Sequence, residues 1–361
     1  MNYTIHDSDT RVRNYIDRKI EAHDAAGIQY IVVSADTTIF GYSGGWADVE
    51  AKMPLRPNTT MMIYSMSKTM TATAVLQLIE QGKIALDDTV TKYLGDIPYG
   101  SQVTIRHLLS QTSGIPNPIP LKWVHLVEEH STFNEKAALR KLLTENSELD
   151  FQPGKKYAYS NISYWLLGEI IEKVSGVTYQ DFVRQNVFQK LNLPESEADF
   201  IIPSPDNHSK GYLPKWSFLN LFKSFVIDSE FVGKYENGWL HIKNHYLNGP
   251  SFGGIVSSTY SVSVFLQDQL RDHSLLFTKE TKNLFFEQQK NNDGEFVEMT
   301  LGWHVGTTGN VKYYFKEGGG GGFHSEMRIY PTHGIASVVI ANNTSFDARG
   351  FLNTVDKEFF P

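Results

Sequence analysis

The chain lacks cysteine, long apolar runs and clusters of basic residues, and each absence excludes a class of protein. Without cysteine, the 361 residues can form no disulfide, no thiolate nucleophile and no cysteine-ligated metal. The apolar stretches are far shorter than the roughly 20 residues that cross a bilayer. Residues 1–11 are polar and acidic, unlike the core of a signal peptide. We therefore expect no transmembrane segment. As written, the chain is expected to be cytoplasmic, or periplasmic or secreted if a leader has been removed.

The balance of charge argues against a nucleic-acid partner. Lys and Arg number 33 and Asp and Glu number 40, so the net charge is −7, and no run of basic residues is present. The remaining composition is that of an ordinary globular protein, whose length suggests roughly two domains. No nucleic-acid partner is therefore expected, and the sequence leaves the oligomeric state open.

One stretch of the chain has no charge at all, and it follows a serine. From Thr69 to Ile79 no residue is charged, and apolar residues cover most of the circumference of a predicted helix. Ser65 and Lys68 lie three positions apart at its start, so a helix would place the amine one turn above the hydroxyl. Burial lowers the pKa of a lysine, as a base for a serine hydroxyl requires near neutral pH. The tetrapeptide alone is weak, because S-x-x-K arises about once by chance in such a chain.

Apolar patterns predict strands at both ends of the chain and helices between them. Helices are expected at residues 9–25, 65–79, 105–111, 137–143, 164–174, 179–191 and 354–360. Strands are expected at residues 28–34, 38–42, 302–305, 311–316, 326–330 and 335–341. This order predicts an α/β fold: an antiparallel sheet flanked by N- and C-terminal helices, with a large, mainly helical insertion.

The same pattern divides the chain into three parts. Residues 1–64 and 251–361 are expected to form the α/β sheet domain and residues 65–198 the helical domain, with a cleft between them. Residues 199–250 show no clean period. They form either an aromatic cap that shapes a substrate pocket or meets a lipid surface, or a satellite hydrophobic cluster beneath a long insertion. The aromatic residues of this segment include Trp216, Phe218, Phe222, Phe225, Phe231, Tyr235, Trp239 and Tyr246.

Two short motifs could complete a site around Ser65. In Tyr159-Ser160-Asn161, the tyrosine could share its proton with Lys68 and relay it to a leaving group, and the Asn161 amide could hold the lysine or a substrate carbonyl. Lys316-Glu317-Gly318 ends a predicted strand and enters a run of glycines, where a strand can approach a substrate and offer an N–H to an oxyanion. Taken alone, the first motif would usually be just a turn, and the second would be a flexible hairpin loop.

In this order and spacing, the motifs resemble the penicillin-binding-protein-like serine hydrolases. That family includes class C β-lactamases, D-alanyl-D-alanine carboxypeptidases and β-lactamase-like esterases. Residues 64–83 look like its first motif and helix, and residues 104–114, TIRHLLSQTSG, match a recurrent segment that is more specific than any catalytic triplet. The segments that resemble its later motifs are 159–168, 253–258 and 316–323. The resemblance covers residues 28–341 and implies the β-lactamase/transpeptidase-like fold.

The resemblance also implies a role for each matching residue. Ser65 would be the nucleophile, Lys68 the base and Tyr159 the proton relay. Backbone N–H groups of Ser65 and Gly319 would form the oxyanion hole. The substrate-binding or oxyanion residues would be Asn161, Lys316, Glu317, Gly318 and Gly319. The implied reaction is acylation of Ser65 followed by hydrolysis of the acyl-enzyme, with neither metal nor cofactor.

One departure from the family pattern bears on the substrate. Where the lactamases and peptidases usually carry a hydroxyl residue that helps hold a substrate carboxylate, this chain has Glu317. Its charge should repel a carboxylate unless Lys316 or Arg328 compensates. We therefore expect a hydrolase of small esters or amides rather than of β-lactams. A true β-lactamase or D-alanyl-D-alanine carboxypeptidase or D-aminopeptidase, an acyltransferase, and a non-catalytic penicillin-binding-like sensor stay open as alternatives.

Other candidate chemistry is weaker. His241 and His245 have the spacing of two metal ligands on a helix, but no acidic third ligand follows. His107 and His324 lie near motifs, yet a Ser-His-Asp site would need a G-x-S-x-G elbow, which Ser65 lacks. The glycine run is not followed by the Lys-Ser or Lys-Thr of a phosphate loop.

Overall fold

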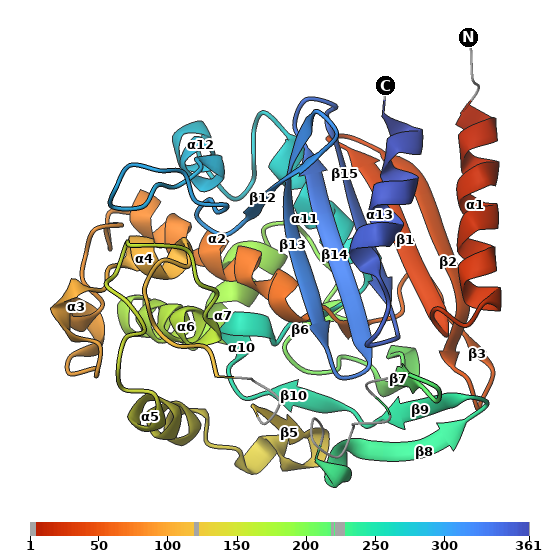
Figure 1. Cartoon of the computed structure of the whole chain (residues 1–361), viewed down its shortest axis with the longest axis horizontal. Coiled ribbons are helices and arrows are strands. Elements are labelled where there is room, and N and C mark those ends of the chain that lie inside the picture. Colours follow the sequence, from red (N-terminus) through yellow and green to blue (C-terminus); the bar gives the residue numbers. More distant parts are fainter. Residues whose placement is uncertain (1–4, 119–122, 218–219, 221–227, 361) are drawn as a thin grey trace.

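The computed structural model describes residues 5–118, 123–217, 220 and 228–360. A seven-stranded antiparallel sheet with the order β12-β13-β14-β15-β1-β2-β3 dominates it (Figure 1). Its strands are β1 (Gly27–Ser34), β2 (Thr38–Asp48), β3 (Met53–Pro54), β12 (His304–Thr308), β13 (Val311–Gly320), β14 (Phe323–Tyr330) and β15 (Ile335–Ala341). Both central strands, β1 and β15, are buried along nearly their whole length because helices cover the two faces. The predicted α/β class is confirmed.

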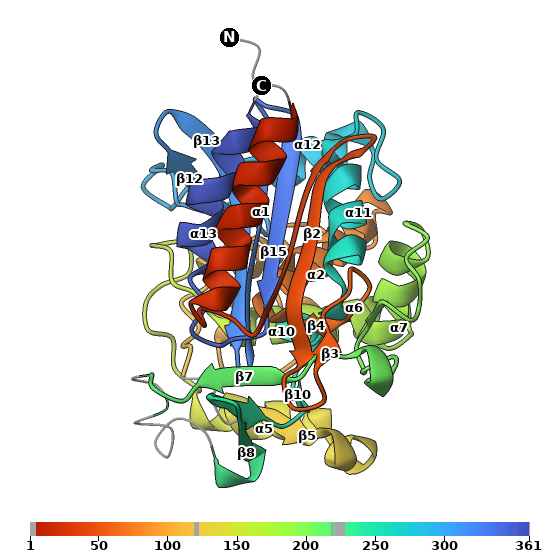
Figure 2. The ribbon, with the colours of Figure 1, turned by 90° about the vertical axis from the view of Figure 1, so that its right-hand side faces the viewer.

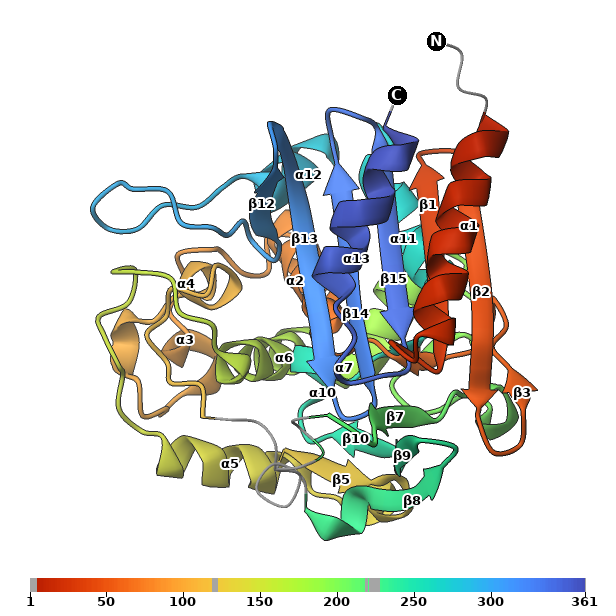
Figure 3. The same ribbon diagram turned by 45° about the vertical axis from the view of Figure 1, so that its right-hand side comes forward.

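Two helices from the ends of the chain cover the outer face of the sheet (Figure 3). They are α1 (Ile5–Glu21) and α13 (Ala348–Val355). The prediction of a closing helix at 354–360 is wrong in position. The helix begins earlier because the carboxylate of Asp347 caps it, accepting a hydrogen bond from the Gly350 N–H at 2.9 Å. Only a 3-10 turn, Asp356–Phe359, follows it.

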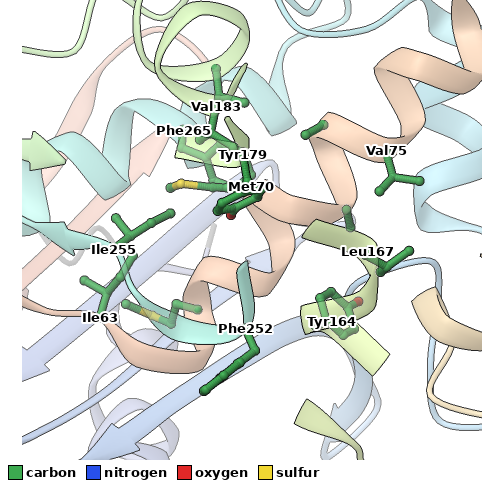
Figure 4. Packing of buried hydrophobic residues seen from close by; sticks show 14 of the residues in the cluster. Ile63, Met70, Val75, Tyr164, Leu167, Tyr179, Val183, Phe252, Ile255 and Phe265 are labelled. Atoms are coloured by element: carbon green, nitrogen blue, oxygen red, sulfur yellow. The ribbon is translucent and has the colours of Figure 1, made fainter. Parts of the chain in front are cut away.

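A helical part packs against the inner face, around α2 (Ser67–Glu80). Apart from Lys68 and Glu80, no residue of α2 is charged, and the whole run from Ser67 to Leu78 is buried. Figure 4 shows Met70 and Val75 of α2 within this core. The other helices of the inner side are α3 (Thr91–Leu94), α4 (Ile105–Leu109), α5 (Glu135–Glu145), α6 (Asn161–Ser175), α7 (Tyr179–Val183), α10 (Pro250–Gly253), α11 (Thr259–Leu270) and α12 (Lys279–Phe286).

Two segments on this side differ from prediction in the type of helix they form. Ser65 lies in a 3-10 turn, Tyr64–Met66, that precedes α2, rather than in the first α-helical turn. The helix predicted at 179–191 is α-helical only in α7, and a π-helical turn, Arg184–Phe188, continues it. Among the described residues, no helix has both the length and the apolar character that crossing a membrane requires.

Residues 199–250 contain short strands, which lie at one end of the molecule below the main sheet (Figures 1 and 2). These are β7 (Gly211–Pro214), β8 (Val232–Glu236), β9 (Trp239–Ile242) and β10 (His245–Leu247). The order β7-β9-β8 forms one small sheet, and β10 pairs with β5 (Val124–Leu126). We call residues 123–133, 211–214 and 228–248 the cap. Trp239 is buried there in a satellite cluster with Tyr212, whereas Trp216 is 91% exposed. Phe218, Phe222 and Phe225 lie outside the described residues.

Candidate active site

The turn that carries Ser65 follows a short strand, β4 (Met61–Met62), and leads directly into α2. Lys68 occupies the first turn of α2, and its Nζ lies 3.0 Å from Ser65 Oγ. The 3-10 turn continues into the helix in the same right-handed sense, so the two side chains still meet one turn apart. The contact predicted from their spacing is therefore present.

Lys68 is fully buried and has no carboxylate partner among the described residues. Its Nζ donates to Asn161 Oδ1 at 2.7 Å and to the backbone carbonyl of Phe252 at 2.5 Å. Burial, and secondly the charge of Lys316, lower the pKa of the amine well below its usual 10.5. A neutral amine has two protons, which these two acceptors satisfy, and its lone pair is then left to face Ser65.

Tyr159 approaches the same serine oxygen from another side. Its hydroxyl donates to Ser65 Oγ at 2.7 Å, and burial raises the pKa of the phenol. Lys68 Nζ lies 4.9 Å and Lys316 Nζ 5.0 Å from the centre of the ring. His304 stacks beside the ring at 6.4 Å with an interplanar angle of 18°. The hydroxyl is thus a proton donor at neutral pH, next to two amines.

Lys316, on β13, is fully buried, and its Nζ has no hydrogen-bond partner among the described residues. Burial lowers the pKa of this amine to about 7, although the charge of Glu317 opposes the shift. Side chains alternate along a strand, so Lys316 points toward Tyr159 while Glu317 points to the opposite face of the sheet.

On that outer face, two basic side chains contact the carboxylate of Glu317. His324 Nε2 lies 2.8 Å and Arg349 Nη2 3.0 Å from its carboxylate oxygens, and the His324 contact is the main cause of its lowered pKa. Arg328, proposed above as a compensating charge, pairs with Glu326 at 2.5 Å instead. The compensating groups are thus His324 and Arg349, and the predicted repulsion of a substrate carboxylate by Glu317 loses its basis.

The glycine run of β13 is explained by its close approach to the serine turn. A Cβ on Gly318 would lie 2.1 Å from the carbonyl oxygen of Ile63, and one on Gly320 would lie 2.5 Å from the ring of Tyr64. A Cβ on Gly319 would lie 3.2 Å from the side chain of His324, which is flexible. Gly319 lines the same pocket as Ser65, as its predicted oxyanion role requires.

Tyr64 links these two elements, and sequence reasoning missed it. Its backbone is left-handed, with φ +45°, which is uncommon for a side chain of this size. The buried hydroxyl donates to the Gly321 carbonyl at 2.6 Å, and His245 Nε2 lies 3.2 Å from the same hydroxyl. Ser65 is therefore preceded by a strained residue that is tied to both β13 and the cap. No periodic or motif signal marks such a contact in the sequence.

A pocket of about 310 Å³ opens onto Ser65. It is lined by Tyr64, Ser65, Asn117, Val124, Tyr159, Asn161, Phe231, Ile242, His245, Leu247, Phe252 and Gly319–Gly321. Asn117, also missed, accepts a hydrogen bond from the Asn161 N–H at 3.0 Å and so fixes the start of α6. A larger groove of about 810 Å³ lies beside α12 and contains none of these residues.

The remaining candidates lie elsewhere or cannot act as proposed. His107 caps α4, its Nδ1 accepting from the Thr104 N–H at 3.2 Å. His241 and His245 lie on two separate strands, so their spacing is not that of a helix face. Within the described part of the chain, no group of three or more His, Asp or Glu side chains could hold a metal ion.

Comparison with known proteins identifies the family of this chain. A model of the β-lactamase family matches residues 12–358, so the chain belongs to the β-lactamase family. The expectation drawn from the motifs is confirmed.

Two curated relatives are similar in sequence. A penicillin-binding protein of Bacillus subtilis (strain 168) is 28% identical over 308 residues, which cover 84% of this chain and 65% of that protein. Protein flp of Staphylococcus aureus (strain MRSA252) is 29% identical over 194 residues, which cover 52% of this chain and 38% of that protein. The chain thus spans less than two thirds of the length of either relative.

Solved structures share the fold. An octameric penicillin-binding protein homologue from Pyrococcus abyssi superposes with a TM-score of 0.76 at 22% identity, over 95% of this chain and 75% of that one. A D-amino acid amidase from Ochrobactrum anthropi SV3 gives a TM-score of 0.76 at 19% identity, over 98% of both chains. At these identities the likeness concerns the fold.

Proposed function

We propose that the protein is a serine hydrolase that forms an acyl-enzyme at Ser65 and acts on small esters or amides. The observation that carries this proposal is the convergence of two groups on one oxygen. The buried amine of Lys68 lies 3.0 Å and the hydroxyl of Tyr159 2.7 Å from Ser65 Oγ. A neutral amine and a neutral phenol at these distances can take a proton from the serine and deliver it to a leaving group.

Acylation begins when Ser65 Oγ attacks the carbonyl carbon of the substrate. The serine proton passes to the lone pair of Lys68, and the carbonyl oxygen gains charge beside the N–H groups of Ser65 and Gly319. Tyr159 gives its proton to the leaving oxygen or nitrogen as the bond to carbon breaks, and it regains a proton from Lys68. The acyl-enzyme and a neutral alcohol or amine result.

Deacylation runs the same steps with water. Water attacks the acyl carbon, its proton passes through Tyr159 and Lys68, and Ser65 Oγ leaves with a proton. The similarity to a penicillin-binding protein and to the fold of a D-amino acid amidase keeps a peptide substrate as a second candidate. It would use the same residues and differ in the leaving group.

Intact-mass measurement after exposure to a fluorophosphonate tests the nucleophile. Wild type should gain one phosphonate adduct and Ser65→Ala none, whereas an unmodified wild type would contradict the proposal. Parallel exposure to penicillin separates the candidates, because a slow, stable penicilloyl adduct would indicate a penicillin-binding protein. Steady-state turnover of nitrocefin as fast as that of short-chain p-nitrophenyl esters would favour a β-lactamase instead.

A further inference from the structure

One wall of the pocket beside Ser65 is apolar, and the cap supplies most of it. Its residues are Val124, Phe231, Ile242, Leu247 and Phe252. Phe231, Ile242 and Phe252 are buried at 6%, 2% and 2% exposure, and Val124 pairs with Leu247 across β5 and β10. Val124 and Leu247 are thus held by paired strands, and the wall presents aliphatic and aromatic surface to whatever enters the pocket.

The chemistry at Ser65 decides which part of a substrate meets this wall. The leaving group must lie beside the Tyr159 hydroxyl, which is on the side of Lys316 and His304. The carbonyl oxygen must face Gly319 on the glycine strand. The remaining substituent on the carbonyl carbon, the acyl side chain, is therefore directed away from Tyr159 and toward the cap.

Among the described residues that line the pocket, none carries a charge. His245 is the one titratable imidazole there; burial lowers its pKa, and its Nδ1 lies 2.8 Å from the carbonyl of Lys243. Lys68 and Lys316 are fully buried outside the lining. A carboxylate at the end of an acyl chain would lose its water there and gain no charged partner.

We propose that this wall binds an uncharged, apolar acyl group, so that the substrates are esters or amides of neutral aliphatic or aromatic acids. The inference rests on the proposed function and adds the substrate class. The pocket volume of about 310 Å³ suits an acyl group of modest size. Acids that carry a second carboxylate at the far end of the chain are excluded.

Two esters of equal chain length test the proposal: p-nitrophenyl pentanoate and mono-p-nitrophenyl glutarate. They share a leaving group and differ in a terminal carboxylate. Wild type should prefer the pentanoate in kcat/KM by roughly 30-fold or more, since the glutarate must bury a charge. Equal rates on the two esters, with normal phosphonate labelling of Ser65, would overturn this inference alone. Absence of labelling would overturn the proposed function and the inference with it.

A positive charge placed in the wall should weaken the preference for the pentanoate. Val124→Lys adds an ammonium at a partly exposed position of the lining, so the pentanoate-to-glutarate ratio should fall by roughly tenfold. Leu247→Lys makes the same change from the opposite strand, should the first variant fail to fold. Val177→Lys, at 39% exposure outside the lining, is the matched control and should keep the wild-type ratio. A ratio unmoved in both wall variants while Ser65 is still labelled would refute the assignment.

Discussion

At the scale of single residues, the site depends on the amine of Lys68, which is buried where the charged form is disfavoured. Lys68 is surrounded by the rings of Tyr159, Tyr164 and Phe252, each within 5.6 Å of its Nζ. No described carboxylate pairs with it, so nothing restores the pKa that burial lowers. A lysine can serve as a base in such surroundings because it can give up its proton, whereas an arginine cannot.

Lys68→Arg should therefore impair catalysis, because a guanidinium keeps its proton and cannot act as the base. We expect kcat/KM for a p-nitrophenyl ester to fall by about 10³-fold, the usual contribution of a positioned general base. The exposed Lys83→Arg, just beyond the end of α2, is the matched control and should leave the rate unchanged. If Lys68→Arg kept more than a tenth of the activity, a base role for this amine would be untenable.

Tyr64 offers a second test at this scale, because its hydroxyl ties the serine turn to the Gly321 carbonyl. Tyr64→Phe keeps the ring and removes the bond, so kcat should fall roughly tenfold while KM changes little. Tyr99→Phe makes the same chemical change at a buried tyrosine remote from the pocket, whose hydroxyl donates to the Asn146 carbonyl at 2.7 Å.

Both tyrosine variants should lose about 1 kcal/mol of unfolding free energy, measured by urea denaturation. Only Tyr64→Phe should lower kcat. An equal kcat for the two variants would show that the bond at Tyr64 is structural.

At the scale of elements, β13 sets the distance between the sheet and the serine turn. Its glycines let the backbone pass over Ile63 and Tyr64 with no side chain between. Beyond Phe315 the strand no longer pairs with β12, so that edge is free to face a substrate. The glycine strand and the turn thus form one unit, although more than 250 residues separate Tyr64 from Gly321.

Alanine substitutions along this strand should differ sharply in effect. In Gly318→Ala the new methyl would meet the Ile63 carbonyl, so β13 must move away, and we expect kcat/KM to fall about 100-fold. In Gly319→Ala the methyl faces the side chain of His324, which can shift, so the loss should stay within roughly fivefold. Steady-state ester hydrolysis measures both. Similar losses would mean that clearance from Ile63 does not set the geometry.

The elements that sequence reasoning located well are those whose pattern follows from burial alone. The strand predicted at 28–34 and the helix predicted at 65–79 are buried nearly throughout. The closing helix was displaced because a capping carboxylate, Asp347, decided its start and the apolar pattern did not. The strands of the cap could not be predicted because they are three to five residues long, too short for a period to appear.

At the scale of the whole molecule, the site exists only where three distant parts meet. Ser65 and Lys68 come from the start of the helical part, Lys316 from the sheet, and Phe231 and Ile242 from the cap. The sequence motifs predicted which residues would meet in the site, since each motif can be identified from its own local spacing. They could not predict Tyr64, His304 or the Phe252 carbonyl, because those contacts arise from packing between parts.

This assembly buries the amines of Lys68 and Lys316 in one cleft. Their burial should lower the unfolding free energy by an amount that depends on pH. Burial lowers the pKa of Lys316 from 10.5 to about 7, so between these values the unfolded chain binds a proton that the folded chain does not. The unfolding free energy of wild type should therefore rise as the pH rises from 7 toward 10.5. Below pH 7 the folded and the unfolded chain both hold the proton, so the full free-energy cost of burying the charged Lys316 applies.

Lys316→Met removes this penalty while filling similar volume. We expect it to increase the unfolding free energy by about 2–4 kcal/mol at pH 7, with the gain shrinking toward zero near pH 10 as the unfolded lysine also loses its proton. Urea denaturation at a series of pH values measures the difference, and the exposed Lys155→Met is the control that should show no such slope. A gain that stayed constant up to pH 10 would mean that Lys316 keeps its proton in the folded protein, because only a group that releases its proton on folding makes stability depend on pH in this window.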